Sequence, residues 1–241
     1  MWDFLKFSST LKPVFQTDLH SHLLPGIDDG AKSFEESAMV IKCMIDIGFT
    51  KAITTPHVIS DAYRNTPAII KAKAQELKAY LNANNIIFRI EAAAEYMLDE
   101  MVWDALNQNQ ELLTFSDNYI LFETNTYDEP PLLNDFIFKL KVKNLIPVLA
   151  HPERYKYLLN NHERIEDLFE RGVLFQVNAL SLMGNYSKPI QRVARFLLDK
   201  RLIHFVGSDC HSQKHAIAIK NGIKNKYFQK ALELPLLNYT I

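Results

Sequence analysis

The chain has little cysteine and little glycine. Only two of its 241 residues are cysteines, Cys43 and Cys210, and seven are glycines. Two cysteines outside a C-x-x-C pattern are too few for a disulfide framework, so we expect reduced thiols. Neither is followed six positions later by arginine, as a cysteine-dependent phosphatase loop requires: these positions hold Phe49 and Ala216. No glycine-rich phosphate loop pattern occurs, so nucleotide binding of that kind has no support.

A strong charge of one sign and long apolar runs are also missing. The chain has 27 Lys and Arg against 28 Asp and Glu, interspersed along its length. This balance provides no basic stripe for nucleic acid. No window approaches 18 uncharged apolar residues, and the first six residues lack the pattern of a secretory signal. We therefore expect no nucleic-acid partner, no membrane insertion and a cytoplasmic location.

Short β-branched and aromatic runs alternate with longer helical patterns. The runs at 14–19, 52–55, 87–92, 119–123, 146–150, 174–177 and 203–206 are typical of strands. Ser33 and Glu36 form a capping box before one helical pattern, which Gly48 ends, and Thr66-Pro67 opens the next. Strands alternating with helices indicate a parallel sheet. At this length, the pattern predicts a single α/β domain over residues 1–241.

Ligand-type side chains follow six of the seven predicted strands. In parallel α/β barrels the carboxyl ends of the strands carry the chemistry, so these side chains are expected at one edge. Asn178 follows the remaining strand. Histidines and carboxylates without thiolates suit Zn²⁺, Mn²⁺ or Fe²⁺ in a catalytic site. The residues are His20, His22, His57, Glu95, Glu123, His151, Asp209 and His211.

The loop after the first strand contains two further carboxylates. Either Asp28 or Asp29 could join the cluster, but the Asp-Gly pair at 29–30 is also a common turn. We expect Asp18 to have a supporting or structural role rather than to be a ligand.

With these residues assembled, the chain resembles the PHP (polymerase and histidinol phosphatase) superfamily. Within it, the resemblance is to the bacterial capsular-polysaccharide tyrosine-protein phosphatases. It rests on the motifs Asp18-Leu-His-Ser-His22, Leu24-Pro-Gly-Ile-Asp-Asp-Gly-Ala31, Thr55-Pro-His57, Ala94-Glu-Tyr96, Ala150-His-Pro-Glu-Arg-Tyr155, Gln176-Val-Asn-Ala179 and Gly207-Ser-Asp-Cys-His211. The resemblance implies a distorted seven-stranded β/α (TIM-like) barrel with a trinuclear metal centre.

The resemblance also implies how the ligands are divided. His20, His22, Glu95 and Asp209 would hold one ion; Glu95, Glu123 and His151 a second; Asp29, His57 and His211 a third. The resemblance favours Asp29 over Asp28 as the metal ligand from this loop. Mn²⁺ is expected first, with Fe, Zn or Mg as alternatives.

By the same resemblance, the protein is a metal-dependent phosphatase of phosphotyrosine. Its expected partner is the phosphotyrosine-bearing tail of a bacterial tyrosine autokinase that regulates capsule or exopolysaccharide synthesis. Arg154 matches the family's phosphate-binding arginine. A second arginine that the family often has is missing from residues 212–216. Either Lys214 replaces this arginine in binding the phosphate, or the second phosphate clamp is absent. The alternatives are a small-molecule phosphatase of histidinol-phosphatase type and a non-catalytic PHP binding module.

Overall fold

The computed structural model describes residues 14–116 and 118–241. The N-terminal residues used to exclude a signal peptide lie outside this part of the chain. All strand pairings are parallel, in one sheet of three strands and another of six. The strands are β1 (Thr17–Leu19), β2 (Lys51–Thr54), β3 (His57–Val58), β4 (Arg89–Ala92), β5 (Glu95–Met97), β6 (Tyr119–Glu123), β7 (Ile146–Ala150), β8 (Leu174–Asn178) and β9 (Phe205–Gly207).

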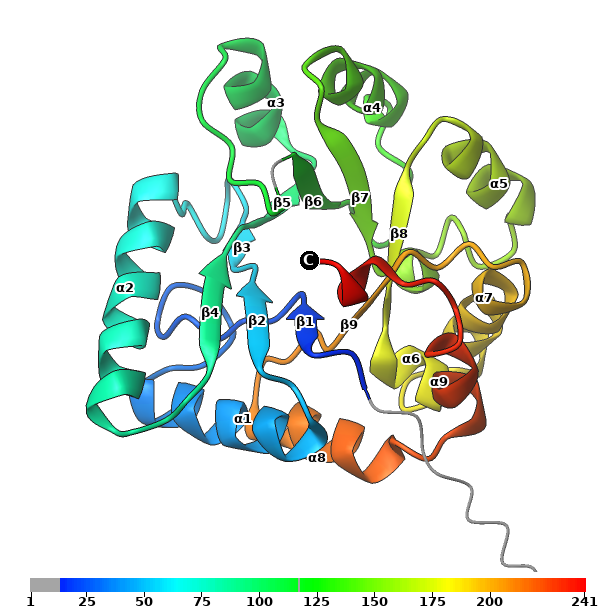
Figure 1. Cartoon of the computed structure of the whole chain (residues 1–241). Helices are drawn as coiled ribbons and strands as arrows, with labels where there is room; N and C mark the ends of the chain where they lie inside the picture. The colour runs from blue at the N-terminus through cyan, green and yellow to red at the C-terminus, as the bar shows by residue number, and fades with distance from the viewer. Residues whose placement is uncertain (1–13, 117) are drawn as a thin grey trace, which may run out of the picture.

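The two sheets curl around one interior, with the helices outside (Figure 1). The first sheet has the order β1-β2-β4 and the second β3-β5-β6-β7-β8-β9. The backbone N–H of Glu95 donates to the carbonyl of Pro56 at one junction, and that of Asp209 donates to His20 at the other. Alternate residues of the strands fill the interior with apolar side chains, among them Leu19 and Ile53. The predicted α/β class with a parallel sheet is therefore confirmed.

The predicted count of seven strands is not confirmed. Each predicted strand has a counterpart, but the structure adds β3 and β5, which follow β2 and β4 after two residues each. Pro56 has no N–H to donate, so the strand that begins with β2 cannot continue as a regular ladder there.

The helices largely follow the signals in the sequence. In α1 (Phe34–Ile47), the Ser33 hydroxyl accepts from the Glu36 N–H, and Gly48 ends the helix at φ 115°. Thr66 caps α2 (Pro67–Ala83) in the same way. The others are α3 (Glu100–Asn107), α4 (Leu133–Val142), α5 (His162–Glu170), α6 (Ala179–Met183), α7 (Lys188–Asp199), α8 (Gln213–Gly222) and α9 (Lys226–Ala231), with 3₁₀ turns η1 (Pro152–Arg154) and η2 (Leu237–Tyr239). Among the described residues, no helix is long and apolar enough to cross a membrane.

Candidate metal centre

The predicted ligands lie at the carboxyl edge of the curled sheets, as expected for parallel strands. His20 and His22 follow β1, His151 follows β7, and Asp209 and His211 follow β9. The added strands β3 and β5 each begin with a predicted ligand, His57 and Glu95, which are paired in register. Glu123 is the last residue of β6. The breaks that raise the strand count therefore turn two side chains toward the site.

All nine predicted ligands fall into groups whose donor atoms lie within 4.8 Å of one another. The groups are His22, Asp29, His57 and His211; His20, His22 and Glu95; His20, His151 and Asp209; and His57, Glu95 and Glu123. The resemblance implied that His151 shares an ion with Glu95 and Glu123, whereas this grouping places His57 with these two carboxylates. The division of ligands among three ions stays a prediction.

Glu95 lies at the middle of the cluster and is fully buried. Its Oε2 is 3.1 Å from His20 Nε2, 3.1 Å from His57 Nδ1 and 3.6 Å from His22 Nε2. Its Oε1 is 3.0 Å from His151 Nε2. One carboxylate thus faces four imidazoles, an arrangement suited to bridging two ions.

Several of these close contacts are not hydrogen bonds. The buried atoms His20 Nε2, His22 Nε2, His57 Nδ1, Glu95 Oε2 and Glu123 Oε1 have no hydrogen-bond partner within the described structure. Buried polar atoms are nearly always paired. Nitrogen and oxygen lone pairs that converge without hydrogen-bond geometry fit a set of metal ligands, so the residues present fit divalent ions.

The charges of the cluster support the same conclusion. Burial opposes ionisation of His20, but the carboxylates of Glu95 and Asp209 outweigh it and raise its pKa to about 9. Burial is likewise outweighed at His57, where Glu95 and Glu123 raise the pKa to about 12. The neighbouring imidazoles overcome the burial of Glu95 and hold its pKa well below the usual range. The Glu95 carboxylate is therefore anionic, and divalent ions would displace protons from His20 and His57 on binding.

The structure separates the roles of the two loop aspartates. Asp28 Oδ2 accepts a 2.8 Å hydrogen bond from His22 Nδ1, and Oδ1 accepts from the Gly30 N–H. Asp29 Oδ1 lies 3.2 Å from His211 Nε2 and 3.5 Å from His57 Nε2. Asp28 therefore orients a ligand, leaving His22 Nε2 toward the centre, while Asp29 is placed as a ligand itself.

Gly30 allows this loop to pack against β1. A Cβ at position 30 would lie 2.2 Å from the His22 carbonyl oxygen and 2.5 Å from the His22 Cβ. Contacts this short are sterically forbidden, so a side chain here would move His22 or the aspartates beside it.

The comparisons with known proteins agree with this geometry. The family described as capsular polysaccharide synthesis, CpsB/CapC, matches residues 16–230. The chain belongs to the CpsB/CapC family. It is 32% identical over 197 residues to the tyrosine-protein phosphatase YwqE of Bacillus subtilis, covering 82% of this chain and 78% of that protein. It is 27% identical over 203 residues to the tyrosine-protein phosphatase CpsB of Streptococcus pneumoniae, covering 81% of this chain and 82% of that protein.

A solved structure supports the membership. It comes from crystal structures of YwqE and CpsB, described as unique metal-dependent tyrosine phosphatases. The match has a TM-score of 0.80 and 29% identity, and it covers 90% of each chain. The candidate ligand cluster of this CpsB/CapC chain thus lies on a fold shared with proteins described as metal-dependent tyrosine phosphatases.

Arg154 lies beside the centre of this CpsB/CapC-family chain. Its Nη1 donates to Asp209 Oδ2 at 2.9 Å, and its guanidinium lies 5.7 Å from the Tyr186 ring centroid. The side chain keeps 40% of its surface exposed. One edge of the guanidinium is thus anchored to a predicted ligand, while the group remains accessible to an anion.

Lys214 lies in the first turn of α8 and is exposed. It lines a hollow of about 350 Å³ together with His211 of the cluster and with Met39 and Val40 of α1. Lys214 thus shares a hollow with one predicted ligand, and its role as a phosphate clamp stays a prediction.

Two aromatic residues at the site were not predicted as functional. From the sequence, Tyr63 could line the site, although a solvated loop is favoured; in the structure its ring stacks on His57 with 5.8 Å between centroids. Tyr186 contacts Arg154. Tyr63 and Tyr186 lie several residues beyond the ends of the predicted strands at 52–55 and 174–177, so an analysis of strand ends does not select them.

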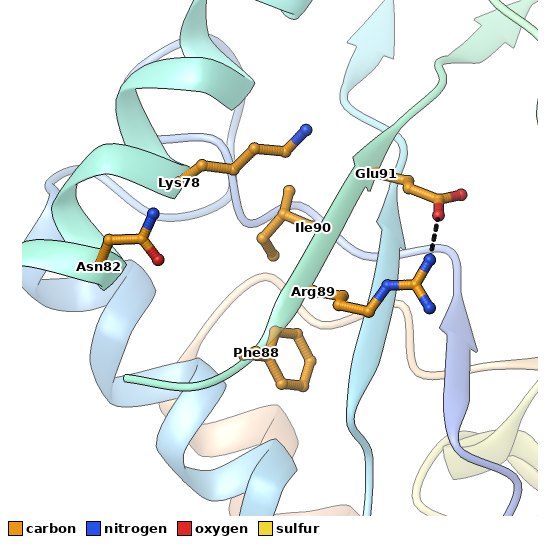
Figure 2. Close-up of a pocket in the computed structure, with 6 residues that line it drawn as sticks. All are labelled: Lys78, Asn82, Phe88, Arg89, Ile90 and Glu91. Carbon is orange, nitrogen blue, oxygen red and sulfur yellow. Dashed lines mark hydrogen bonds and ion pairs between the residues drawn. The ribbon is translucent and has the colours of Figure 1, made fainter. Parts of the chain in front are cut away.

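A separate hollow lies beside β4 (Figure 2). It has a volume of about 360 Å³ and lies between α2 and the start of β4, lined by Lys78, Asn82, Phe88, Arg89, Ile90 and Glu91. Arg89 and Glu91 pair with each other at 3.2 Å. None of the nine predicted ligands lines this hollow, so it contributes nothing to the centre.

Proposed function

We propose that this chain is a metal-dependent phosphatase that hydrolyses phosphotyrosine. The observation that carries the proposal is the buried convergence of unpaired histidine and carboxylate atoms around Glu95. The names of YwqE and CpsB as tyrosine-protein phosphatases support the choice of substrate.

The proposed centre holds three divalent ions, with Mn²⁺ first and Fe, Zn or Mg as alternatives. The ligands are the nine grouped residues, of which Asp29, Glu95, Glu123 and Asp209 are carboxylates. Four carboxylates offset four of the six positive charges, so the centre attracts a phosphate dianion. When bound, the ions lower the pKa of water toward about 7 and offset negative charge on the phosphoryl oxygens.

The protein's own residues bind and orient the substrate in this proposal. Arg154 donates to the phosphate with the part of its guanidinium that Asp209 does not occupy. The phenolate leaving group has a parent pKa of about 10 and needs little help from an acid. Cys210 has no role as a nucleophile, because it is fully buried and burial raises the pKa of its thiol.

We also propose that the fold is a distorted seven-stranded barrel forming one PHP-type domain over residues 1–241. In this interpretation β2 with β3, and β4 with β5, each count as one interrupted strand. Two backbone hydrogen bonds support this interpretation: the Ala93 N–H donates to the Thr54 carbonyl, and the Glu95 N–H donates to the Pro56 carbonyl. These bonds continue the pairing of the two interrupted strands through their breaks.

The proposed substrate is the phosphotyrosine-bearing tail of a bacterial tyrosine kinase that controls capsule or exopolysaccharide synthesis. The family's link to capsular polysaccharide synthesis supports this proposal. A cytoplasmic location accompanies it, because a kinase that uses ATP is phosphorylated there.

Kinetic preference tests the proposed substrate. With the metal-loaded protein, we expect kcat/KM to be at least tenfold higher for a phosphotyrosine peptide than for histidinol phosphate, a difference of about 1.4 kcal/mol. The reverse preference would indicate a small-molecule phosphatase. No turnover of either substrate at full metal occupancy would indicate a binding module.

Lys214→Ala tests whether lysine replaces the missing arginine. If Lys214 binds the phosphate, the variant should lower kcat/KM for the phosphotyrosine peptide at least tenfold, about 1.4 kcal/mol, with unchanged metal content. Lys220→Ala is the matched control, since Lys220 lies on the same helix and pairs with Asp46. An unchanged kcat/KM in Lys214→Ala would show that this clamp is absent.

A further inference from the structure

Strand β8 ends without a predicted ligand, yet its last residues contact the cluster. Gln176 and Asn178 are fully buried. Being two residues apart on a strand, they point to the same face. Gln176 Oε1 lies 2.7 Å from His20 Nδ1, and Asn178 Nδ2 donates to Asp209 Oδ2 at 2.6 Å. Gln176 Nε2 donates to Asn178 Oδ1 at 2.9 Å, which joins the two contacts into one chain.

The direction of every bond in this chain is fixed by its surroundings. The backbone N–H of His151 can only donate, and it lies 3.4 Å from Gln176 Oε1. At the other end, the ionised Asp209 carboxylate can only accept, so the Asn178 amide must present its NH₂ group. Both amide orientations therefore agree, and Gln176 presents an oxygen to His20.

Because Gln176 presents an oxygen, His20 must donate from Nδ1. Nε2 is then the ring nitrogen that can bind an ion once its proton is displaced, on the side where Glu95 Oε2 and Asp209 Oδ1 lie 3.1 and 3.5 Å away. The same chain holds Asp209 Oδ2, which Asn178 shares with Arg154. The tautomer of one ligand and the orientation of another are thus set by two neutral amides.

We propose that Gln176 and Asn178 are positioning residues that fix the His20 tautomer and aim Asp209 Oδ1 at the same ion. The proposal rests on the proposed metal centre. Hydrogen bonds that orient ligands commonly govern metal affinity. Here a single amide pair acts on the ligands that follow two strands, β1 and β9.

The space around Gln176 supports a fixed side-chain position. A Cβ at Gly207 would lie 2.5 Å from Gln176 Nε2 and 2.4 Å from the Leu19 carbonyl oxygen. The absence of a side chain at Gly207 is therefore required for the amide to lie between β8 and β9. The Asn178 N–H also donates to the buried Glu153 Oε1 at 2.9 Å, which anchors the end of β8.

Metal affinity tests the proposal. Asn178→Asp keeps the size of the side chain but replaces its donor with a carboxylate oxygen facing Asp209. We expect the apparent Kd for Mn²⁺, measured by competition with a chelator, to rise by about 10–100-fold. Asn82→Asp, an exposed change of the same kind on α2, should leave it unchanged. A wild-type Kd in Asn178→Asp would overturn the proposal.

Two Gln176 variants separate positioning from a loss of packing. Gln176→Leu removes the acceptor for His20 Nδ1–H and should weaken Mn²⁺ binding by a similar factor, whereas Gln176→Glu keeps an acceptor and should recover part of the loss. In the Zn²⁺-loaded protein, imidazole ¹H–¹⁵N spectra should show His20 protonated at Nδ1, and in Gln176→Leu this signal should shift or broaden. Equal affinities for the Leu and Glu variants, or a wild-type His20 protonated at Nε2, would contradict the proposal. Failure of the wild-type protein to bind metal would instead refute the proposed function.

Discussion

Glu95→Gln should empty most of the metal centre and lower kcat/KM for a phosphotyrosine peptide about a thousandfold, which corresponds to about 4 kcal/mol. Glu95 is fully buried and belongs to two of the ligand groups. Its Oε2 faces the imidazoles of His20 and His57 at 3.1 Å each. An amide of the same size removes a charge shared by two groups and places an N–H among ligand atoms.

Asp29→Asn is the matched comparison, because it makes the same carboxylate-to-amide change. Asp29 is half exposed and belongs to one ligand group, whereas Glu95 is buried and belongs to two. We expect the metal-to-protein ratio to fall further in Glu95→Gln than in Asp29→Asn. Elemental analysis of both purified variants decides this. Full metal occupancy in Glu95→Gln would remove Glu95 from the bridging role.

Arg154→Ala should keep its metal but lose about 2–4 kcal/mol of transition-state stabilisation, or about 30- to 1,000-fold in kcat/KM. Metal content should survive because Asn178 still holds Asp209 Oδ2 at 2.6 Å. Burial lowers the pKa of Arg154, but the charge of Asp209 outweighs this effect and raises the pKa. The guanidinium is therefore cationic when substrate binds.

Arg154→Lys should recover only part of the loss, since an ammonium cannot reproduce the planar fork of the guanidinium. Arg171→Ala is the control, because Arg171 pairs only at the surface with Asp167. Steady-state kinetics and metal analysis on the same preparations measure both quantities. A wild-type kcat/KM in Arg154→Ala would exclude Arg154 from phosphate binding, and loss of metal would reassign it to the centre.

The local signals in the sequence predicted much of the fold. The Ser33 cap and Gly48 end of α1 depend on backbone groups within a few residues, so they can be read directly from the chain. The strand ends carrying His20, Glu123 and His151 follow from short buried runs. Pro56 marks the break before β3 in the sequence, but no such residue precedes β5, and the pairing of His57 with Glu95 joins strands that are distant in the chain.

The supporting contacts of the site were harder to predict. Asp28 and Asp29 are adjacent in an acidic turn, and only the fold shows that one bonds His22 while the other faces His211. Gln176 was part of a recognised motif, but its contact with His20 joins residues 156 positions apart. Such roles depend on tertiary distances that no local pattern encodes.

Stepwise reconstitution of the chelator-treated protein tests the central claim most directly. Mn²⁺ is added in increments while bound metal per chain and the rate of phosphotyrosine-peptide hydrolysis are measured on the same samples. We predict no turnover without metal and a rate that rises with occupancy to its maximum at three ions per chain. A metal-free protein that hydrolyses the peptide at the full rate would contradict a metal-dependent phosphatase.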